Sequence, residues 1–241
     1  MPNVSFNFSS VRFSNRTLKN IILKNLTQTA RAFALIAGLV LSTTWATSAP
    51  ALADDTEDAK AFVNQLASSA ISILASDSTP KVREDEFRTL FVSNLDMRRI
   101  GLFTLGQYAR TPTPEQKAEY LELVQEFIVK IYSGRLNEFS NETVNVLDAS
   151  PKGKKGKQFL VRSQINFTTG REPVSVVWWL LKDGDSFKVF DVQVVGIWMA
   201  QEQRAAFASV ISKNNGDFTA LLNDLKRQIG EASIGHQTAT K

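Results

Sequence analysis

Side chains that could catalyse a reaction are scarce in this chain. It contains no cysteine and a single histidine, His236, close to the carboxyl terminus. A chain without cysteine has no disulfide, no thiolate nucleophile and no cysteine-bound metal. A Ser-His-acid triad or a histidine metal site would have to recruit His236 from a polar chain end. We therefore expect no metal or other cofactor, and this poor set of catalytic groups favours a protein that is not an enzyme over the alternatives considered below.

Carboxylates are the remaining candidates for acid–base chemistry. Glu84, Asp85 and Glu86 form one cluster at the expected start of a helix, where acidic side chains favour the positive end of the helix dipole. Asp191 lies within the expected strand 187–195, where an aspartate is disfavoured unless something compensates it. Two interpretations of Asp191 stay open. It is either an acid in a cavity, as in cone-shaped isomerase folds, or a structural clamp held by backbone amides or an arginine.

Aromatic side chains are numerous for one domain. They either fill an ordinary core or line an apolar cavity for a large ligand. Periodicity does not separate the two, because a cavity wall and a core face use the same residue types. The aromatic residues concerned are Phe103, Tyr108, Phe127, Tyr132, Phe159, Phe167, Trp178, Trp179, Phe187, Phe190 and Trp198.

The elements that position these residues follow from the spacing of apolar side chains. The spacing predicts helices over 54–76, 81–105 (two short ones), 114–139, 200–214 and 218–229, and strands over 143–147, 157–167, 174–181 and 187–195. Asp96 can cap the second short helix, and residues 113–116, Thr-Pro-Glu-Gln, read as a capping box. The order of elements predicts an α+β fold in which helices pack on a curved four-stranded antiparallel sheet. If the aromatic side chains line a cavity, we expect this arrangement to be cone-like and to enclose an apolar pocket, as the resemblance described below also implies.

The first 53 residues have the features of a secretory signal peptide. They carry five basic and no acidic side chains, an apolar run of ten residues over 32–41, and the small residues Ala51-Leu52-Ala53. Ten residues are too few to span a bilayer, which needs about 20. We therefore expect cleavage after Ala53, a single domain over 54–230 and a flexible tail over 231–241. Removal of the leader leaves 23 basic against 24 acidic side chains, which gives no support for a nucleic-acid partner.

One stretch of the chain resembles a known family. Residues 87–116, FRTLFVSNLDMRRIGLFTLGQYARTPTPEQ, resemble the MlaC or toluene-tolerance family, which reads FR.LF…D…I..F.LG.Y.R..TPEQ here. The similarity continues through Phe190-Asp191-Val192 and Gln203-Arg204, and covers roughly residues 58–229. Two departures stand at the end of the last strand. Val195 replaces a frequent glutamate, and Trp198 replaces a small polar residue.

The resemblance implies a periplasmic carrier that holds phospholipid acyl chains in an apolar pocket between sheet and helices. Such a carrier shuttles lipid between an outer-membrane lipoprotein complex and an inner-membrane ABC transporter complex. The alternatives are a small-ligand enzyme that uses Asp191 and a non-catalytic adaptor domain with a filled core. If the chain is a carrier, the residues that we expect to line the pocket are Phe103, Tyr108, Phe127, Ile131, Val161, Ile165, Val176, Trp178 and Val189.

Overall fold

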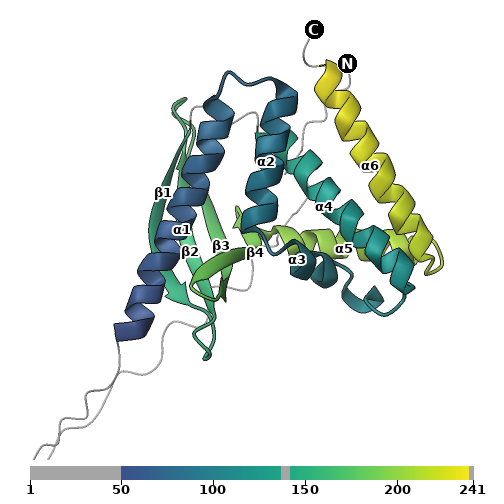
Figure 1. Ribbon diagram of the computed structural model, residues 1–241, viewed down its shortest axis with the longest axis horizontal. Coiled ribbons are helices and arrows are strands. Elements are labelled where there is room, and N and C mark those ends of the chain that lie inside the picture. Colours follow the sequence, from purple (N-terminus) through teal and green to yellow (C-terminus); the bar gives the residue numbers. More distant parts are fainter. Residues whose placement is uncertain (1–49, 137–141, 239–241) are drawn as a thin grey trace, which may run out of the picture. The chain divides into compact units, whose positions relative to one another are not determined.

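The structure is a computed structural model that describes residues 50–136 and 142–238, with side chains described for 54–133 and 142–233. Helices come first, a sheet follows, and two helices close the chain (Figure 1). The elements are α1 (Pro50–Ala75), α2 (Pro80–Asn94), α3 (Met97–Thr104), the 3₁₀ turn η2 (Gly106–Tyr108), α4 (Pro114–Leu136), β1 (Thr143–Pro151), β2 (Gln158–Asn166), β3 (Val174–Asp183), β4 (Ser186–Val194), β5 (Ile197–Trp198), α5 (Met199–Lys213) and α6 (Phe218–Thr238).

The sheet is an antiparallel meander in the order β1-β2-β3-β4-β5. This confirms the predicted α+β class, with one strand more than expected. The additional strand, β5, has two residues and pairs with the end of β4 across the two-residue turn Val195-Gly196. Both turn residues have positive φ, 51° and 84°, which a two-residue hairpin turn of this kind requires. So short a strand leaves no alternation in the sequence from which it could be predicted.

The helix starts follow the predicted caps. The Asp96 carboxylate accepts a hydrogen bond from the backbone N–H of Arg99 at 3.0 Å and so opens α3. At the start of α4, the N–H of Gln116 donates to Thr113 Oγ1 at 3.2 Å, and the N–H of Thr113 donates to Gln116 Oε1 at 3.0 Å. These reciprocal bonds are the predicted capping box, and they satisfy two backbone donors that a helix start leaves unpaired.

Two of the predicted boundaries lie in terminal parts of the chain. The expected leader lies outside the described residues except for its last four, Pro50 to Ala53, which form the start of α1. At the other end, α6 continues to Thr238, beyond the expected domain boundary at residue 230. Within the described residues, no helix is both long enough and apolar enough to cross a membrane.

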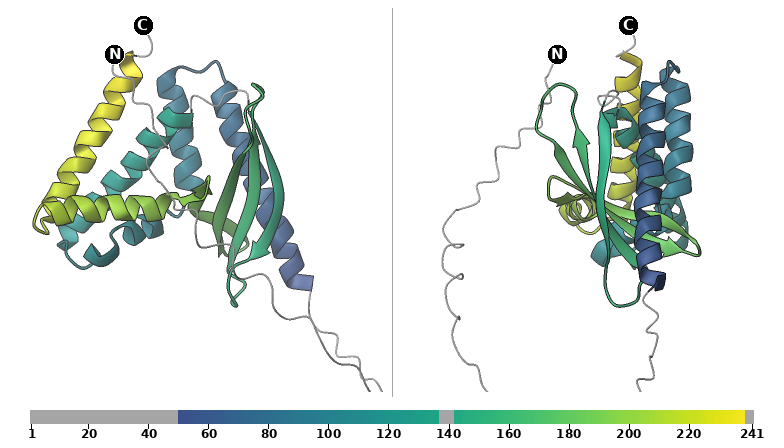
Figure 2. Two further views of the ribbon diagram at one scale, coloured as in Figure 1. Left: turned by 180° about the vertical axis from the view of Figure 1, so that it is seen from behind. Right: turned by 90° about the vertical axis from the view of Figure 1, so that its left-hand side faces the viewer.

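The two faces of the sheet are covered by different helices. Helix α1 packs along β1 and β2, and α3 and α5 contact β4 (Figures 1 and 2). We call the face of the sheet under α1 the α1 face, and the face against α3 and α5 the α5 face. Because β3 is covered on both sides, its sequence is apolar at successive positions, as predicted. The α1 face is closed by a cluster that we call the sheet cluster: Ala59, Val63, Leu66, Phe159, Val161, Leu180, Phe187 and Val189.

A second core lies among the helices. Helix α4 contacts α2, α3 and α6, which explains why its apolar residues spread over more than one stripe. Buried side chains from α4, α5 and α6, together with the residue that precedes η2, form what we call the helix cluster: Leu105, Tyr120, Val124, Phe127, Phe207, Ile211, Phe218, Leu221, Leu222 and Leu225. A third, smaller group joins the two and is called the junction cluster: Ile100, Leu181, Phe190 and Ala200, with Leu95, Phe103, Ile128 and Trp179 packed against it.

Candidate ligand-binding site

The nine residues predicted to line a pocket fall into separate groups. The strand register places Val161, Ile165, Val176, Trp178 and Val189 on the α1 face. Phe127 belongs to the helix cluster, against which Tyr108 and Ile131 pack, whereas Phe103 packs against the junction cluster. These three groups do not form one contact set, and Val161 is 0% exposed beneath α1.

A row of aromatic rings follows the junction cluster on the α5 face. Phe103 meets Phe190 edge-on, with ring centroids 5.2 Å apart, and Phe190 meets Trp179 at 4.9 Å. Trp179 then meets Trp198 at 5.9 Å. Phe190 is buried, whereas Phe103, Trp179 and Trp198 are half-buried. We call these four residues the aromatic row. The row touches both the sheet and α3.

Local strand geometry gives the row its position. The ladder between β3 and β4 is interrupted between Trp179 and Leu180, and Phe190 is the unpaired residue opposite that point. A bulge of this kind bends the strand and changes which side chains point to a face. Phe190 and Trp179 therefore lie together on the α5 face, where the indole N–H of Trp179 donates to Gln158 Oε1 at 3.1 Å.

Asp191 acts as a clamp between the sheet and α5. Its Oδ1 accepts hydrogen bonds from the backbone N–H groups of Val192 and Ala200, each at 2.8 Å. Ala200 lies in the first turn of α5, so a strand carboxylate satisfies one of the helix's unpaired donors. The side chain is buried, and burial raises the pKa of Asp191, although the N–H groups of Ala200 and Val192 partly offset the shift. The structure favours the clamp interpretation, through backbone amides and not through an arginine.

The acidic cluster of α2 also has a structural role. Because α2 begins at Pro80, the cluster lies one turn later than predicted and away from the end of the helix dipole. Glu84 instead pairs with Lys130 of α4 at 2.6 Å, and Asp85 pairs with Lys81 at 2.6 Å. Among the described residues no group of three potential metal-binding side chains occurs.

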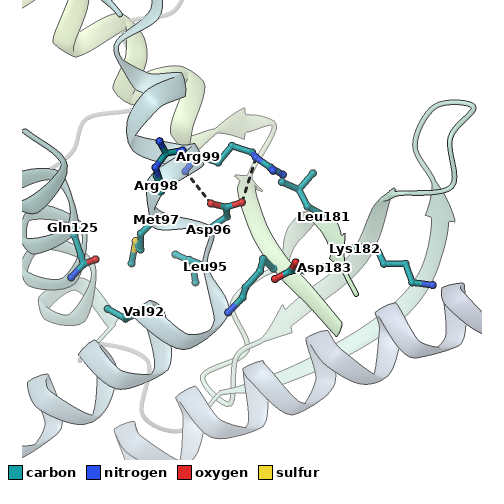
Figure 3. Close-up of a pocket in the computed structure, with 11 residues that line it drawn as sticks. Val92, Leu95, Asp96, Met97, Arg98, Arg99, Gln125, Leu181, Lys182 and Asp183 are labelled. Atoms are coloured by element: carbon teal, nitrogen blue, oxygen red, sulfur yellow. Dashed lines mark hydrogen bonds and ion pairs between the residues drawn. The ribbon is translucent and has the colours of Figure 1, made fainter. Parts of the chain in front are cut away.

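One cavity of about 380 Å³ lies where α2 and α3 meet the β3–β4 hairpin (Figure 3). Its lining mixes apolar Val92 and Leu95 with several charged side chains. The Asp96 carboxylate points toward Arg99, whose Nε lies 3.4 Å away, and it also caps α3 (Figure 3). Since so many lining groups are charged, this cavity suits polar ligands better than acyl chains.

A second cavity of about 360 Å³ lies between η2 and α5, at the Phe103 end of the aromatic row. Its lining is less charged than that of the first cavity. The residues that line it are Phe103, Gly106, Gln107, Gln201, Arg204, Ala205 and Ala208. Of the nine residues predicted from the sequence, Phe103 alone lines either of these two cavities.

The sequence prediction missed Trp179, Phe190 and Trp198 as candidate site residues. Trp178 and Trp179 are neighbours in β3, so their side chains point to opposite faces. The prediction that the face of β2 carrying Val161 lines the pocket therefore included Trp178, which pairs with Val161, and excluded Trp179. The available signal was Trp198, because a large aromatic residue replaces a small polar one there, next to the strand end that carries Asp191.

Comparison with known proteins finds similarity both in sequence and in fold. A sequence model of the family "MlaC protein" matches residues 60–227. The toluene tolerance protein ttg2D of Pseudomonas putida is 27% identical over 127 residues, which are 52% of this chain and 57% of that protein. The chain thus matches little more than half the length of that relative.

A solved structure has the same fold. The phospholipid-binding protein from Ralstonia solanacearum, determined in complex with a phospholipid, superposes with a TM-score of 0.64 and 22% sequence identity. The match covers 73% of this chain and 99% of that one, and at this identity it shows the fold. Because the family model spans well over half of the 241 residues, the chain belongs to the MlaC family.

Proposed function

We propose that this protein is a periplasmic carrier of phospholipid that binds acyl chains along the aromatic row. The observation that carries the proposal is the row itself: four aromatic side chains, three of them half-buried, which connect the sheet to α3 and α5. The Ralstonia protein of the same fold binds a phospholipid, which supports the same class of ligand here.

The energetics set what such a carrier needs. Two acyl chains of about 16 carbons, at about 0.8 kcal/mol per buried CH₂, would cost on the order of 25 kcal/mol if left in water. The bilayer offers the lipid the same burial, so a carrier has only to match the membrane approximately. Aromatic rings suit this task because they present a large apolar area with few rotamers to fix. Transfer in either direction is then close to balanced, and partner proteins can determine it.

At about 380 and 360 Å³, the two described cavities lie near the lower end of the about 300–1,000 Å³ that drug-sized ligands occupy, and a phospholipid with two such chains is larger than those ligands. Acyl chains would therefore enter by separating side chains that now touch one another. The junction cluster is the part best suited to open. It is the smallest of the three clusters, and its Phe103, Trp179 and Ile128 are only partly buried. The proposed site thus keeps Phe103 from the predicted set and adds Trp179, Phe190 and Trp198.

The partners and route that we propose follow from family membership. The carrier would receive lipid from, or deliver it to, an outer-membrane lipoprotein complex and an inner-membrane ABC transporter complex. A signal peptide over residues 1–53 would export it to the space between the two membranes. No catalytic step is proposed, because Asp191 is engaged by the backbone of α5 and the lining of the cavity between η2 and α5 contains no acid.

Transfer between vesicles tests the carrier function. Donor vesicles contain a self-quenching fluorescent phospholipid, acceptor vesicles contain none, and a size-selective membrane keeps the two populations apart so that only the protein can pass between them. We expect dequenching in the acceptor chamber that rises in proportion to protein concentration. An acceptor signal equal to the protein-free control would contradict the proposal.

A further inference from the structure

The cavity between η2 and α5 has an unusual charge pattern. Among the residues that line it, Arg204 is the one charged side chain, and none carries a carboxylate. Gln107 and Gln201 add two side-chain amides that can donate hydrogen bonds. Ala205 and Ala208 leave the α5 wall low, so the polar groups stay accessible. A cavity with one cation, two amide donors and no acid is suited to an anion.

The Arg204 side chain is held in place without an acidic partner. Its guanidinium carbon lies 5.3 Å from the centre of the Phe103 ring, a cation–π distance. Gly106 permits this position. It has a φ of +54°, and a Cβ atom there would lie 2.5 Å from Arg204 Nε. Any other residue at position 106 would be strained and would also displace the guanidinium.

Three other arginines of the described chain are held by carboxylates. Arg88 pairs with Glu126 at 2.6 Å, Arg162 with Asp148 at 2.5 Å, and Arg227 with Asp224 at 2.5 Å. Within the described chain, no carboxylate forms an ion pair with Arg204. Its planar set of donors therefore remains available for a ligand, and arginine matches the two oxygens of a phosphate with two parallel hydrogen bonds.

We infer that Arg204, with Gln107 and Gln201, is a phosphate-binding site that anchors the head group of the bound phospholipid. The inference rests on the proposed carrier function. It adds a polar anchor at one end of the aromatic row, because Phe103 both lines this cavity and begins the row. The phosphodiester would lie at Arg204 while the acyl chains follow Phe190 and Trp179. Free inorganic phosphate offers the same oxygens, so the test has to distinguish the two sources.

Competition between two lipids that differ in the phosphate tests the site. The protein is incubated with vesicles that contain equal amounts of phosphatidylglycerol and diacylglycerol with identical acyl chains. The bound lipids are then extracted and quantified by mass spectrometry. A charged hydrogen bond to phosphate should make wild type prefer phosphatidylglycerol by about ten- to a hundred-fold. Arg204→Gln should lose most of this preference while it still takes up lipid.

Two further variants make the result specific. Gly106→Ala keeps the arginine but displaces it, so it should lose the preference as well. Arg110→Gln removes an exposed arginine that lines neither cavity, so it should keep the preference. A preference unchanged in Arg204→Gln would overturn the anchor while leaving the carrier function intact. No lipid on wild type would instead contradict the carrier function.

Titration with inorganic phosphate, measured by calorimetry, distinguishes a site for the lipid head group from a site for free phosphate. The head-group site predicts that phosphate at millimolar concentration neither binds measurably nor displaces lipid, because the acyl chains supply most of the affinity. Phosphate binding that Arg204→Gln abolishes, together with an unaltered lipid preference, would assign the cavity to the free ion and overturn the head-group assignment.

Discussion

Replacing Trp179 with alanine is the most informative test of where the acyl chains lie. Trp179 is half-buried in the aromatic row, in contact with Phe190 at 4.9 Å and Trp198 at 5.9 Å. The matched comparison is Val161→Ala. Val161 is 0% exposed on the opposite face of the sheet, within the sheet cluster under α1. The two variants therefore remove apolar surface from the two candidate walls.

The expected sizes follow from area. An aromatic side chain buries about 150–250 Å², and if lipid covers about half of it, Trp179 contributes about 100 Å² of contact. At about 25 cal/mol per Å², Trp179→Ala should cost about 2.5 kcal/mol of lipid-binding free energy, or about 70-fold in affinity. Val161→Ala should cost about 1.5–3 kcal/mol in unfolding free energy, through lost burial and a cavity, and leave lipid affinity within about twofold.

The assay is the equilibrium partition of fluorescent phospholipid between vesicles and protein, measured beside urea unfolding of each variant. Both variants should be less stable than wild type. A loss of stability alone therefore does not explain a loss of lipid affinity in Trp179→Ala that is absent in Val161→Ala. If Val161→Ala lost lipid and Trp179→Ala kept it, the acyl chains would lie on the α1 face, as the sequence alone had suggested, and the aromatic row would be ordinary core.

Two further predictions concern the scaffold. Burial raises the pKa of Asp191 above the ordinary 3.8, so ionisation of this carboxyl lowers the stability of the folded state. Relative to Asp191→Asn, the unfolding free energy of wild type should therefore fall as pH rises from below 3.8 through the raised pKa. A difference between the two proteins that changes in the opposite direction, in urea titrations at pH 3–7, would refute the raised pKa. Tyr120→Phe removes a buried hydroxyl that lies 2.7 Å from Thr104 Oγ1, while Thr104 keeps its hydrogen bonds to the carbonyls of Ile100 and Gly101. The unfolding free energy should fall by about 1 kcal/mol and lipid uptake should be unchanged. A large loss of lipid uptake would show that Tyr120 and Thr104 belong to the ligand site.

Helices and strands were predictable where local chemistry determines them. The capping box of Thr113 and Gln116 and the cap of Asp96 were readable from the sequence, because each uses side chains three residues apart. The alternation in β2 identified a strand whose Phe159 and Val161 share a face, and the register confirms it. The apolar excess of α4 predicted cover on several sides, which α2, α3 and α6 provide.

The candidate site was harder to predict because it depends on which face each helix covers. Alternation separates Trp178 from Trp179 but does not tell which of them lies under α1. The bulge that places Phe190 beside Trp179 leaves no sequence signal, since it depends on pairing between two strands. The role of Asp191 likewise required the start of α5, nine residues along the chain, to fold back onto β4.

Arg204 shows a third kind of limit. Its motif matches the family, but a sequence match does not reveal whether an arginine has an acidic partner. That property follows from the fold, which brings Gly106 and Phe103 to its side chain and no described carboxylate. Long-range placement, and not residue type, makes this arginine available for a ligand.

The most direct test of the central claim is native mass spectrometry of the protein, purified from its host without detergent. We expect a species heavier than the polypeptide by the mass of a diacyl phospholipid, which releases intact phospholipid on activation in the gas phase. Wild type seen only at the mass of the bare polypeptide, or with a small polar metabolite in place of lipid, would contradict the claim that this chain carries phospholipid.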